Sequence, residues 1–253
     1  MDLDINQYLT RINFRKNPQP DWETLKDLHR LHLLSVPFEN LDVHLKREIH
    51  LNIPELWEKI VGQKRGGICY ELNGLFFYLL RQLGFEARMI SARVVKENGR
   101  IGNEFDHMAI IVNIKEPWLV DVGFGNNFLE PLRLMPEIIQ QDSLGFYQIG
   151  PYDEQYFVLR QSDDGLYFAD KYLFTTISRQ LSDYMAMCRF QQTSPESRFT
   201  RKRICSIVTE TGRVTFSDLN LLITDNGRKT ERMLSGEAEF REMLKQYTGI
   251  DLL

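Results

Sequence analysis

Residues 65–84 read RGGICYELNGLFFYLLRQLG, and they hold the clearest helical pattern in the chain. Apolar side chains recur there at the spacing of one helix face, at Leu72, Leu75, Phe76, Leu79, Leu80 and Leu83. Gly84 is a typical C-terminal stop, and the glycines Gly66 and Gly67 form a loop before the pattern begins. The sequence therefore predicts a helix from Cys69 to Leu83 that packs one face into the protein core.

A cysteine, Cys69, stands at the start of this predicted helix. The free N–H groups and partial positive charge of a helix N-terminus stabilise a thiolate, and glycines before it let a substrate approach the backbone. The alternative is a buried cysteine that only packs, and this alternative is favoured for Cys188 and Cys205. Three widely spaced cysteines predict no disulfide framework, and the absence of a C-x-x-C pair predicts no structural zinc site.

A nucleophilic cysteine needs a base, which is usually a histidine. The chain has five histidines. His29 and His32 share a leucine-rich helical face, where packing is expected, and His44 and His50 lie in a polar loop. His107 opens the apolar run HMAIIV, so it is the best candidate for a base at the mouth of a strand.

An aspartate inside an apolar strand supplies a group that would orient this base. Asp121 lies in WLVDV, where a carboxylate is costly unless it is paired. If the strands 107–114 and 118–122 form a hairpin, residue 109 lies opposite Asp121. His107 and Asp121 are then diagonal neighbours on one face, about 7–8 Å apart between Cα atoms. An ion pair of Asp121 with an arginine or lysine is the alternative.

The rest of the chain follows an α+β pattern. Helical patterns cover residues 22–33, 54–60 and 237–247, and further strand patterns cover 87–95, 156–159, 166–168, 204–209 and 213–216, with a hairpin turn at 210–212. Gly123 and Gly125 predict a plain turn, or a loop whose N–H groups bind a phosphate or acyl group. Helices first and strands later predict an α+β fold with soft boundaries near residues 86 and 190.

Composition limits the class of protein. The chain has 253 residues, of which 43% are hydrophobic and 26% charged, as in folded globular proteins. A formal net charge of −4 argues against nucleic-acid binding through phosphate neutralisation. The apolar runs are too short for a membrane span, and the N-terminus MDLDINQYL does not match a secretion signal. No membrane association and a cytoplasmic location are therefore expected.

Several separate motifs resemble those of the arylamine N-acetyltransferase family, in its bacterial type. They are VPFENL at 36–41, RGGICYELN at 65–73, His107, DVGFG at 121–125 and TSP at 193–195, followed by Phe199 and Thr200. The resemblance implies an N-terminal helical bundle over residues 1–86, a central antiparallel β-barrel over 87–190 and a C-terminal α/β lid over 191–253. It also implies a triad like that of cysteine proteases, made of Cys69, His107 and Asp121, which the residues themselves already indicate.

The resemblance implies a ping-pong reaction with acetyl-CoA as co-substrate and without a metal. Cys69 takes the acetyl group, CoA leaves, and a small aromatic amine or hydrazine then accepts the acetyl group. His107 is implied to hold Cys69 as a thiolate and to transfer protons, and Asp121 to orient His107.

Family positions also imply contacts with the two substrates. The implied CoA contacts are Asn103, Gly125, Phe190, Thr193 and Ser194. The implied walls of the amine site are Phe38, Phe105 and Phe124, whose alternative role is core packing. Glu39 and Arg65 are implied to brace the loop before Cys69, with a surface ion pair as the alternative. Asp106 and Glu196 are acidic where the family pattern is not, which leaves CoA affinity and amine preference open.

Other activities stay open on the sequence. An amide synthase of polyketide assembly is similar in sequence and shares the triad, but joins an aromatic amine to an acyl chain without acetyl-CoA. A papain-like or transglutaminase-like hydrolase would also use a Cys-His-Asp triad. A binding protein that retains the fold is a third alternative, against which the intact Cys, His and Asp argue. The sequence does not determine the physiological amine, the acyl donor or the oligomeric state.

Overall fold

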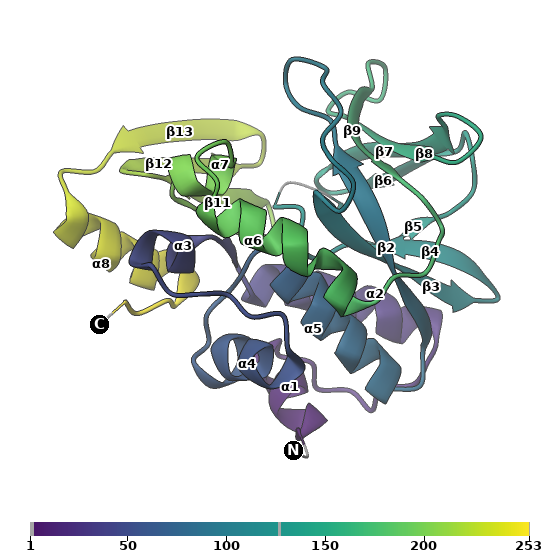
Figure 1. Ribbon diagram of the computed structural model, residues 1–253, viewed down its shortest axis with the longest axis horizontal. Coiled ribbons are helices and arrows are strands. Elements are labelled where there is room, and N and C mark those ends of the chain that lie inside the picture. Colours follow the sequence, from purple (N-terminus) through teal and green to yellow (C-terminus); the bar gives the residue numbers. More distant parts are fainter. Residues whose placement is uncertain (1–2, 126–127, 253) are drawn as a thin grey trace.

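The computed structural model describes residues 3–125 and 128–252. Its N-terminal part is helical (Figure 1), with α1 (Ile5–Arg11), α2 (Trp22–Ser35), α3 (Leu41–Leu45), α4 (Ile53–Trp57), a π-helical turn (Glu58–Gly62) and α5 (Cys69–Gln82). The predicted helix start at Cys69 is confirmed. Because ten of its fourteen residues are buried, α5 is the central helix of this part. No helix in the described ranges has the length and apolar character that a membrane span needs.

An antiparallel sheet follows the helices and curls almost into a barrel. Within residues 3–125 and 128–252 its eight strands pair in the order β5-β4-β3-β2-β9-β8-β7-β6. They are β2 (Glu86–Val94), β3 (His107–Ile114), β4 (Glu116–Val120), β5 (Leu132–Arg133), β6 (Ile139–Asp142), β7 (Gly145–Pro151), β8 (Phe157–Ser162) and β9 (Ala169–Phe174). The Gln140 side chain bridges the two edge strands, because it bonds the backbone N–H and C=O of Arg133 at 2.7 and 3.0 Å. The expected central barrel is thereby confirmed.

A second antiparallel sheet forms near the C-terminus (Figure 1). Its order in the described part of the chain is β1-β10-β11-β12-β13, with β1 (Phe38–Glu39), β10 (Ile204–Thr209), β11 (Gly212–Ser217), β12 (Asn220–Asp225) and β13 (Arg228–Met233). Helix α8 (Glu237–Thr248) packs on it through Phe240, whose ring lies edge-on to Phe216 at 5.6 Å between centroids. A 3-10 turn (Leu181–Tyr184), α6 (Met185–Thr193) and α7 (Arg198–Arg201) connect the barrel to this sheet.

The first and last parts of the chain share this second sheet. Strand β1 comes from the helical part, yet Phe38 pairs with Ser206 and Glu39 with Cys205 of β10. Helix α6 runs through residue 190, where one boundary was expected. The α+β class is confirmed, while the division at residues 86 and 190 stays a prediction.

The local predictions have mixed outcomes. The hairpin of β3 and β4 has the predicted register, because Ile110 pairs with Val120 and residue 109 therefore faces residue 121. The predicted strand at 166–168 is wrong. Asp164 Oδ1 accepts the N–H groups of Leu166 and Tyr167 at 2.8 and 3.1 Å, which holds these residues in an exposed turn before β9.

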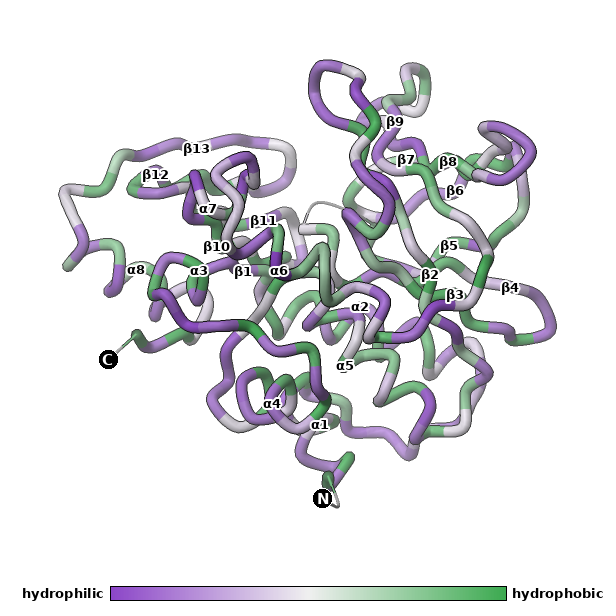
Figure 2. Tube along the Cα trace, viewed as in Figure 1, coloured by the Kyte–Doolittle hydropathy of each residue, from purple (hydrophilic) through white to green (hydrophobic). Residues whose placement is uncertain are grey.

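Some strands were not predicted because their side chains are polar. Figure 2 shows β13 as hydrophilic along most of its length, and all six of its residues are exposed. It forms because its backbone pairs with β12, from Asn220 opposite Met233 to Asp225 opposite Arg228. Backbone pairing of this kind leaves no apolar alternation in the sequence.

Candidate active site

Cys69 is the first residue of α5, and 4% of its surface is exposed. The backbone N–H of Met108 in β3 donates a hydrogen bond to its sulfur. Burial raises the pKa of the Cys69 thiol well above its ordinary value; the Met108 N–H lowers the pKa, and Asp121, Cys188 and Asp106 raise it further. The start of a helix does not offset this burial, so the sulfur needs a neighbouring group that takes its proton, as the search for a base assumed.

A buried histidine–aspartate pair includes the residue directly before Met108. His107 is the first residue of β3, directly before Met108, and Asp121 follows the last residue of β4. Nε2 of His107 lies 2.8 Å from Oδ2 of Asp121, and both side chains are almost fully buried. The predicted contact between the two residues is confirmed. The charged partner of Asp121 is thus His107, and not the arginine or lysine of the alternative.

Hydrogen bonds keep the Asp121 carboxylate ionised. Asn73 Nδ2 and the Gly123 N–H donate to Oδ1 at 2.9 and 3.0 Å, and the Tyr172 hydroxyl donates to Oδ2 at 3.1 Å. Burial raises the pKa of this carboxyl, but the charge of His107 and these hydrogen bonds outweigh burial and leave the pKa below its ordinary value. An ionised acceptor on Nε2 requires that this nitrogen of His107 carries the proton.

Asn73 joins the helix to both strands of the site, and sequence reasoning assigned it no role. It lies one helical turn after Cys69 and is fully buried. Its Nδ2 donates to the Met108 C=O at 2.6 Å, and its Oδ1 accepts the Val122 N–H at 2.9 Å. Together with the bond to Asp121, these contacts fix the position of α5, which carries Cys69, relative to the carboxylate of Asp121. One feature of the sequence could have indicated this role: Asn73 is a single amide among the apolar residues of the helix. Burying an amide is unfavourable unless its polar atoms form hydrogen bonds.

The two histidines of α2 pack, as predicted, and one of them also supports the site. His29 stacks on Phe128, and its Nε2 accepts the backbone N–H of Asp121 at 3.2 Å. His32 bonds the Tyr8 hydroxyl through Nδ1 at 3.0 Å. Burial lowers the pKa of both imidazoles, so both are neutral at physiological pH. The bond of His29 therefore fixes α2 against the segment that carries Asp121, and the bond of His32 fixes α2 against α1.

Two glycines near Cys69 lie against other segments of the backbone, where a side chain would not fit. A Cβ on Gly66 would lie 1.9 Å from the Pro37 carbonyl oxygen, and a Cβ on Gly123 would lie 2.8 Å from the Cys69 Cα. A backbone carbonyl of the chain itself therefore lies where a side chain of residue 66 would be, and the approach of a substrate to this loop stays a prediction.

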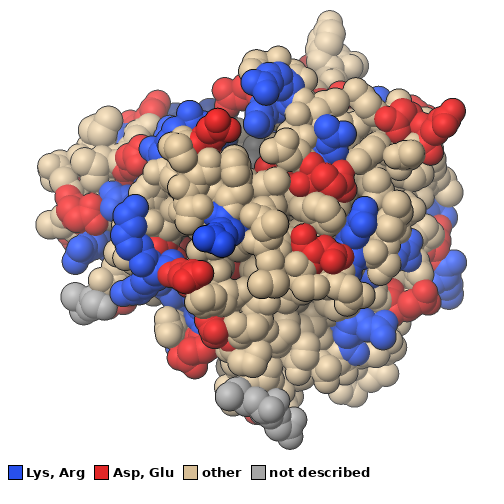
Figure 3. All heavy atoms as spheres, in the orientation of Figure 1, with Lys and Arg blue, Asp and Glu red and all other residues tan. Residues whose placement is uncertain are grey.

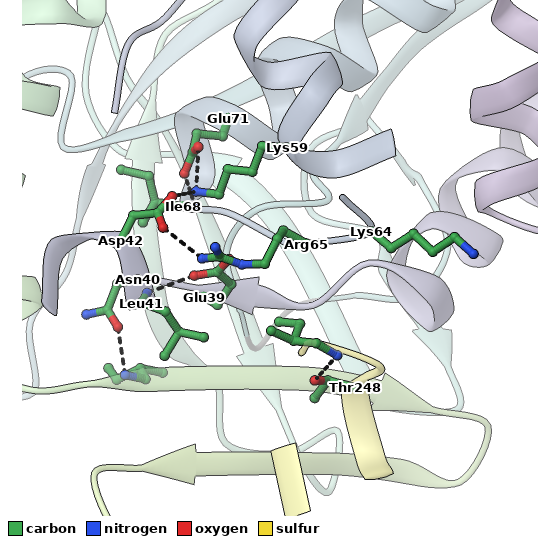
Figure 4. Close-up of polar contacts among 12 residues, drawn as sticks. Glu39, Asn40, Leu41, Asp42, Lys59, Lys64, Arg65, Ile68, Glu71 and Thr248 are labelled. Carbon is green, nitrogen blue, oxygen red and sulfur yellow. Dashed lines mark hydrogen bonds and ion pairs between the residues drawn. The ribbon is translucent and has the colours of Figure 1, made fainter. Parts of the chain in front are cut away.

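Five charged side chains form a buried network beside the loop that precedes Cys69 (Figure 4): Glu39, Asp42, Lys59, Arg65 and Glu71. The Arg65 guanidinium lies 2.8 Å from Glu39 and 3.0 Å from Asp42. The Lys59 ammonium lies 2.7 Å from Asp42 and 2.8 Å from Glu71. Glu71 in turn accepts the N–H of Ile68, directly before Cys69, at 2.9 Å. The alternative of a surface ion pair for Glu39 and Arg65 is thus wrong.

Replacing Arg65 by methionine is expected to lower the stability of the fold strongly. The change leaves the carboxylates of Glu39 and Asp42 buried without their cation, and breaking a buried pair costs about 3–5 kcal/mol. Thermal unfolding followed by circular dichroism measures the effect. The matched control is Arg232→Met, which removes an exposed ion pair with Glu239 and should leave Tm nearly unchanged. Equal, small shifts for both variants would show that the network does not support the fold.

The three predicted aromatic walls lie around Cys69 and His107. The Phe124 ring is edge-on to His107, with 5.0 Å between ring centroids. Phe38 and Phe105 pack against the apolar cluster that contains Cys69. Phe38 and Phe124 also line one narrow crevice. This placement is compatible with an amine site, and the binding roles stay predictions.

The predicted CoA contacts lie on three segments. Gly125 adopts a left-handed conformation with φ of +83°, Asn103 is exposed, and Phe190, Thr193 and Ser194 lie at the end of α6. Of the two acidic departures, Asp106 accepts a hydrogen bond from Gln191 at 3.0 Å and Glu196 is exposed. Asp106 therefore ties the segment before His107 to α6, while the contacts with CoA stay predictions.

Comparisons with known proteins agree with this fold. A family model described as N-acetyltransferase matches residues 21–253, so the chain is an acyltransferase. It is 32% identical to the arylamine N-acetyltransferase of Escherichia coli (strain K12), with 97% of this chain and 88% of that protein covered. The structure of the Mycobacterium smegmatis arylamine N-acetyltransferase matches with a TM-score of 0.92 at 31% identity, over 99% of this chain and 93% of that chain.

A further solved structure is that of the Mycobacterium marinum arylamine N-acetyltransferase in complex with CoA. It matches with a TM-score of 0.90 at 31% identity and covers 98% of this chain and 93% of that chain. This chain therefore belongs to the arylamine N-acetyltransferase family, as its motifs predicted.

Proposed function

We propose that the chain transfers an acetyl group from acetyl-CoA to an aromatic amine or hydrazine through an acetyl-Cys69 intermediate. The observation that carries the proposal is the buried arrangement of Cys69, His107 and Asp121. The N–H of Met108, the residue directly after His107, donates to the sulfur, and Nε2 of His107 lies 2.8 Å from Oδ2 of Asp121. The relative from M. marinum, which was solved with CoA, supports the choice of donor.

In the first half-reaction the thiol of Cys69 gives its proton to Nδ1 of His107. Burial raises the pKa of this thiol, so a thiolate without a neighbouring cation is unfavourable. The thiolate therefore forms only as an ion pair with the imidazolium of His107, which Asp121 stabilises through Nε2. The thiolate attacks the carbonyl carbon of the acetyl thioester. The C–S bond to CoA breaks, and the CoA sulfur leaves with the proton from His107.

In the second half-reaction an amine attacks the carbonyl carbon of acetyl-Cys69. Nδ1 of His107, now neutral, takes a proton from the attacking nitrogen. The C–S bond to Cys69 breaks, the acetylated amine leaves, and the sulfur returns as a thiolate beside the imidazolium. The aromatic walls at Phe38, Phe105 and Phe124 suit a flat acceptor, because aromatic rings bind one another edge-on or offset.

The anionic CoA must be attracted by a few groups close to its binding site and not by the net charge of the protein. The net charge is −4, and Figure 3 shows Lys and Arg side chains interspersed with Asp and Glu over the visible face. A uniform positive field is therefore not what draws CoA to this face. Backbone N–H groups near Gly125 and single cations near the site are the groups that suit the phosphates.

The decisive experiment traps the intermediate. Purified protein is mixed with acetyl-CoA without amine, digested, and analysed by mass spectrometry. An acetyl group on the peptide that contains Cys69, together with one equivalent of free CoA, is the expected result. Adding an aniline or an aryl hydrazine should then remove the acetyl group and release acetylated amine.

The same experiment separates the alternatives. Peptide cleavage without acetylation of Cys69 would favour a hydrolase and contradict the proposal. Amide formation that does not depend on acetyl-CoA would favour an amide synthase and also contradict it. Binding of CoA without an adduct on Cys69 would show a protein that binds but does not transfer. The control is Cys205→Ala, since Cys205 is buried in the second sheet and should not change the yield of adduct.

A further inference from the structure

Lys59 contacts both ends of the loop that precedes Cys69. At the start of this loop, the backbone N–H of Arg65 donates to the Lys59 C=O at 3.0 Å. At its end, the Lys59 ammonium lies 2.8 Å from Oε1 of Glu71, and Oε2 of Glu71 accepts the N–H of Ile68 at 2.9 Å. Ile68 is the residue directly before Cys69. Two polar contacts and one peptide bond therefore connect the ammonium to the residue that carries the sulfur.

The start of α5 depends on the Glu71 carboxylate. The N-cap of this helix is Ile68, whose side chain has no atom that accepts a hydrogen bond. Serine, threonine, aspartate or asparagine usually occupies such a position and bonds the first turn. Here Glu71 reaches back from the first turn to the N–H of the N-cap, which is one half of a capping box. The position of Cys69, the first residue of the helix, is therefore set in part by Glu71.

Glu71 in turn depends on a cation. Its side chain is 1% exposed, and burial raises the pKa of its carboxyl, whereas Lys59 lowers this pKa. The neighbouring carboxylates outweigh the burial of Lys59 and keep its pKa above the ordinary value, so the ammonium stays charged. Figure 4 shows the other cation of the network, Arg65, beside Glu39 and Asp42. In the described part of the chain, the cation in contact with Glu71 is thus Lys59.

The π-helical turn Glu58–Gly62 fixes the place of this ammonium. Lys59 is its second residue, and 12% of the Lys59 side-chain surface is exposed. Turns of this kind are rare in proteins and are frequent at functional sites. Asp42 of α3 contacts the ammonium at 2.7 Å from the side away from Glu71 (Figure 4). The ammonium is therefore held between α3 and α5.

We propose that Lys59 is a positioning residue for Cys69, which acts through Glu71 by holding the backbone of Ile68. The inference rests on the proposed function, in which the sulfur attacks the acetyl carbon. A displacement of about 1 Å at a reacting group can lower a rate about 10²-fold. Among the described residues the Lys59 ammonium contacts carboxylates of the network and no side chain of the triad. Its effect should therefore lie in the rate at which the sulfur reacts and not in the affinity for acetyl-CoA.

The alternative is that Lys59 only stabilises the fold, and a single-turnover experiment separates the two roles. Protein is mixed with an excess of acetyl-CoA without amine, and the adduct on Cys69 is followed over time by mass spectrometry. A loss of folded protein lowers the final amount of adduct. A displaced sulfur instead lowers the rate constant with which the adduct forms.

The variants are Lys59→Met, which keeps an apolar stem, Glu71→Gln, and the two changes combined. We expect each single variant to lower the rate constant about tenfold at saturating acetyl-CoA, and to leave the half-saturating concentration within about twofold. The double variant should be no slower than the slower single variant, because both changes break the same connection. Lys245→Met removes an exposed ion pair with Asp251 and is the control, which should change neither value.

Two results would overturn the inference. One is an unchanged rate constant in Lys59→Met with only a lower Tm or less adduct, which would assign Lys59 to the fold. The other is a double variant in which the two losses multiply, because Lys59 would then act by a route other than Glu71. If Lys59→Met does not fold, Glu71→Gln gives the same comparison of rate constant and amount of adduct.

Alkylation of Cys69 by iodoacetamide provides a second rate constant that needs no acetyl-CoA. We expect the same variants to slow alkylation by about the same factor, since the same sulfur reacts. Wild-type rates of alkylation in both single variants would contradict the positioning role. Wild-type protein that is alkylated on Cys69 but not acetylated would contradict the proposed function, and the alkylation rates of the variants would still decide the role of Lys59.

Discussion

Cys69→Ala is expected to abolish acetyl transfer while the protein stays folded. The variant lacks the only group that forms the acetyl thioester in the proposed reaction, and loss of a triad nucleophile lowers kcat by roughly a millionfold. Stability should change little, because the substitution removes a single buried sulfur atom at the first residue of α5. Release of free CoA in the presence of an aniline measures the rate.

The control for this variant is the fully buried Cys205, replaced by alanine in the same way. Cys205→Ala should keep the wild-type rate, since this cysteine lies in β10, opposite Glu39 of β1. Circular dichroism and Tm of both variants verify that each is folded. Turnover by Cys69→Ala at the wild-type rate would show that the acetyl group never resides on this sulfur.

Asp121→Asn is expected to lower the rate of acetyl transfer by about 10⁴-fold, as the same change does in serine triads. Asp121 accepts bonds on both oxygens, from His107 on Oδ2 and from Asn73 on Oδ1. An amide has a single acceptor oxygen, so its NH₂ group must face one of these donors. If it faces His107, Nε2 loses its proton and the proton moves to Nδ1, which can then no longer accept the proton of Cys69.

The rate of CoA release in the first turnover measures this effect, because His107 is needed to form the thiolate. Asp164→Asn is the matched control. Asp164 also accepts backbone N–H groups, but in the exposed turn before β9, and its replacement should leave the rate unchanged. A first-turnover rate in Asp121→Asn close to that of wild type would show that the carboxylate does not determine the state of His107.

The strongest sequence predictions rest on local patterns. The helix start at Cys69 and the register of the β3–β4 hairpin were predictable, because apolar periodicity and a short link constrain neighbours in the chain. That register alone is enough to predict that His107 lies near Asp121. The strand predicted at 166–168 is wrong because a single side chain, Asp164, holds that segment as a turn.

Long-range polar contacts were not predictable in this way. Asn73 bonds Met108 and Val122, which lie 35 and 49 residues further along the chain. Lys59 contacts Asp42 and Glu71, and no pattern in the sequence assigned a role to any of these three residues. No period or spacing marks such partners, because the contacts arise only when separate elements pack together.

The sequence by itself determined the family, the α+β class and the three residues of the candidate triad, since these depend on residue identity and on spacing along short segments. Only the tertiary structure decided that the thiol of Cys69 has a raised pKa, that Glu39 and Arg65 are buried, and that Asn73 bonds Met108 and Val122. The physical reason is the same for all three. Burial and charge neighbours are properties of the packed protein, and they set the protonation, pairing and direction of side chains whose identity the sequence already contains.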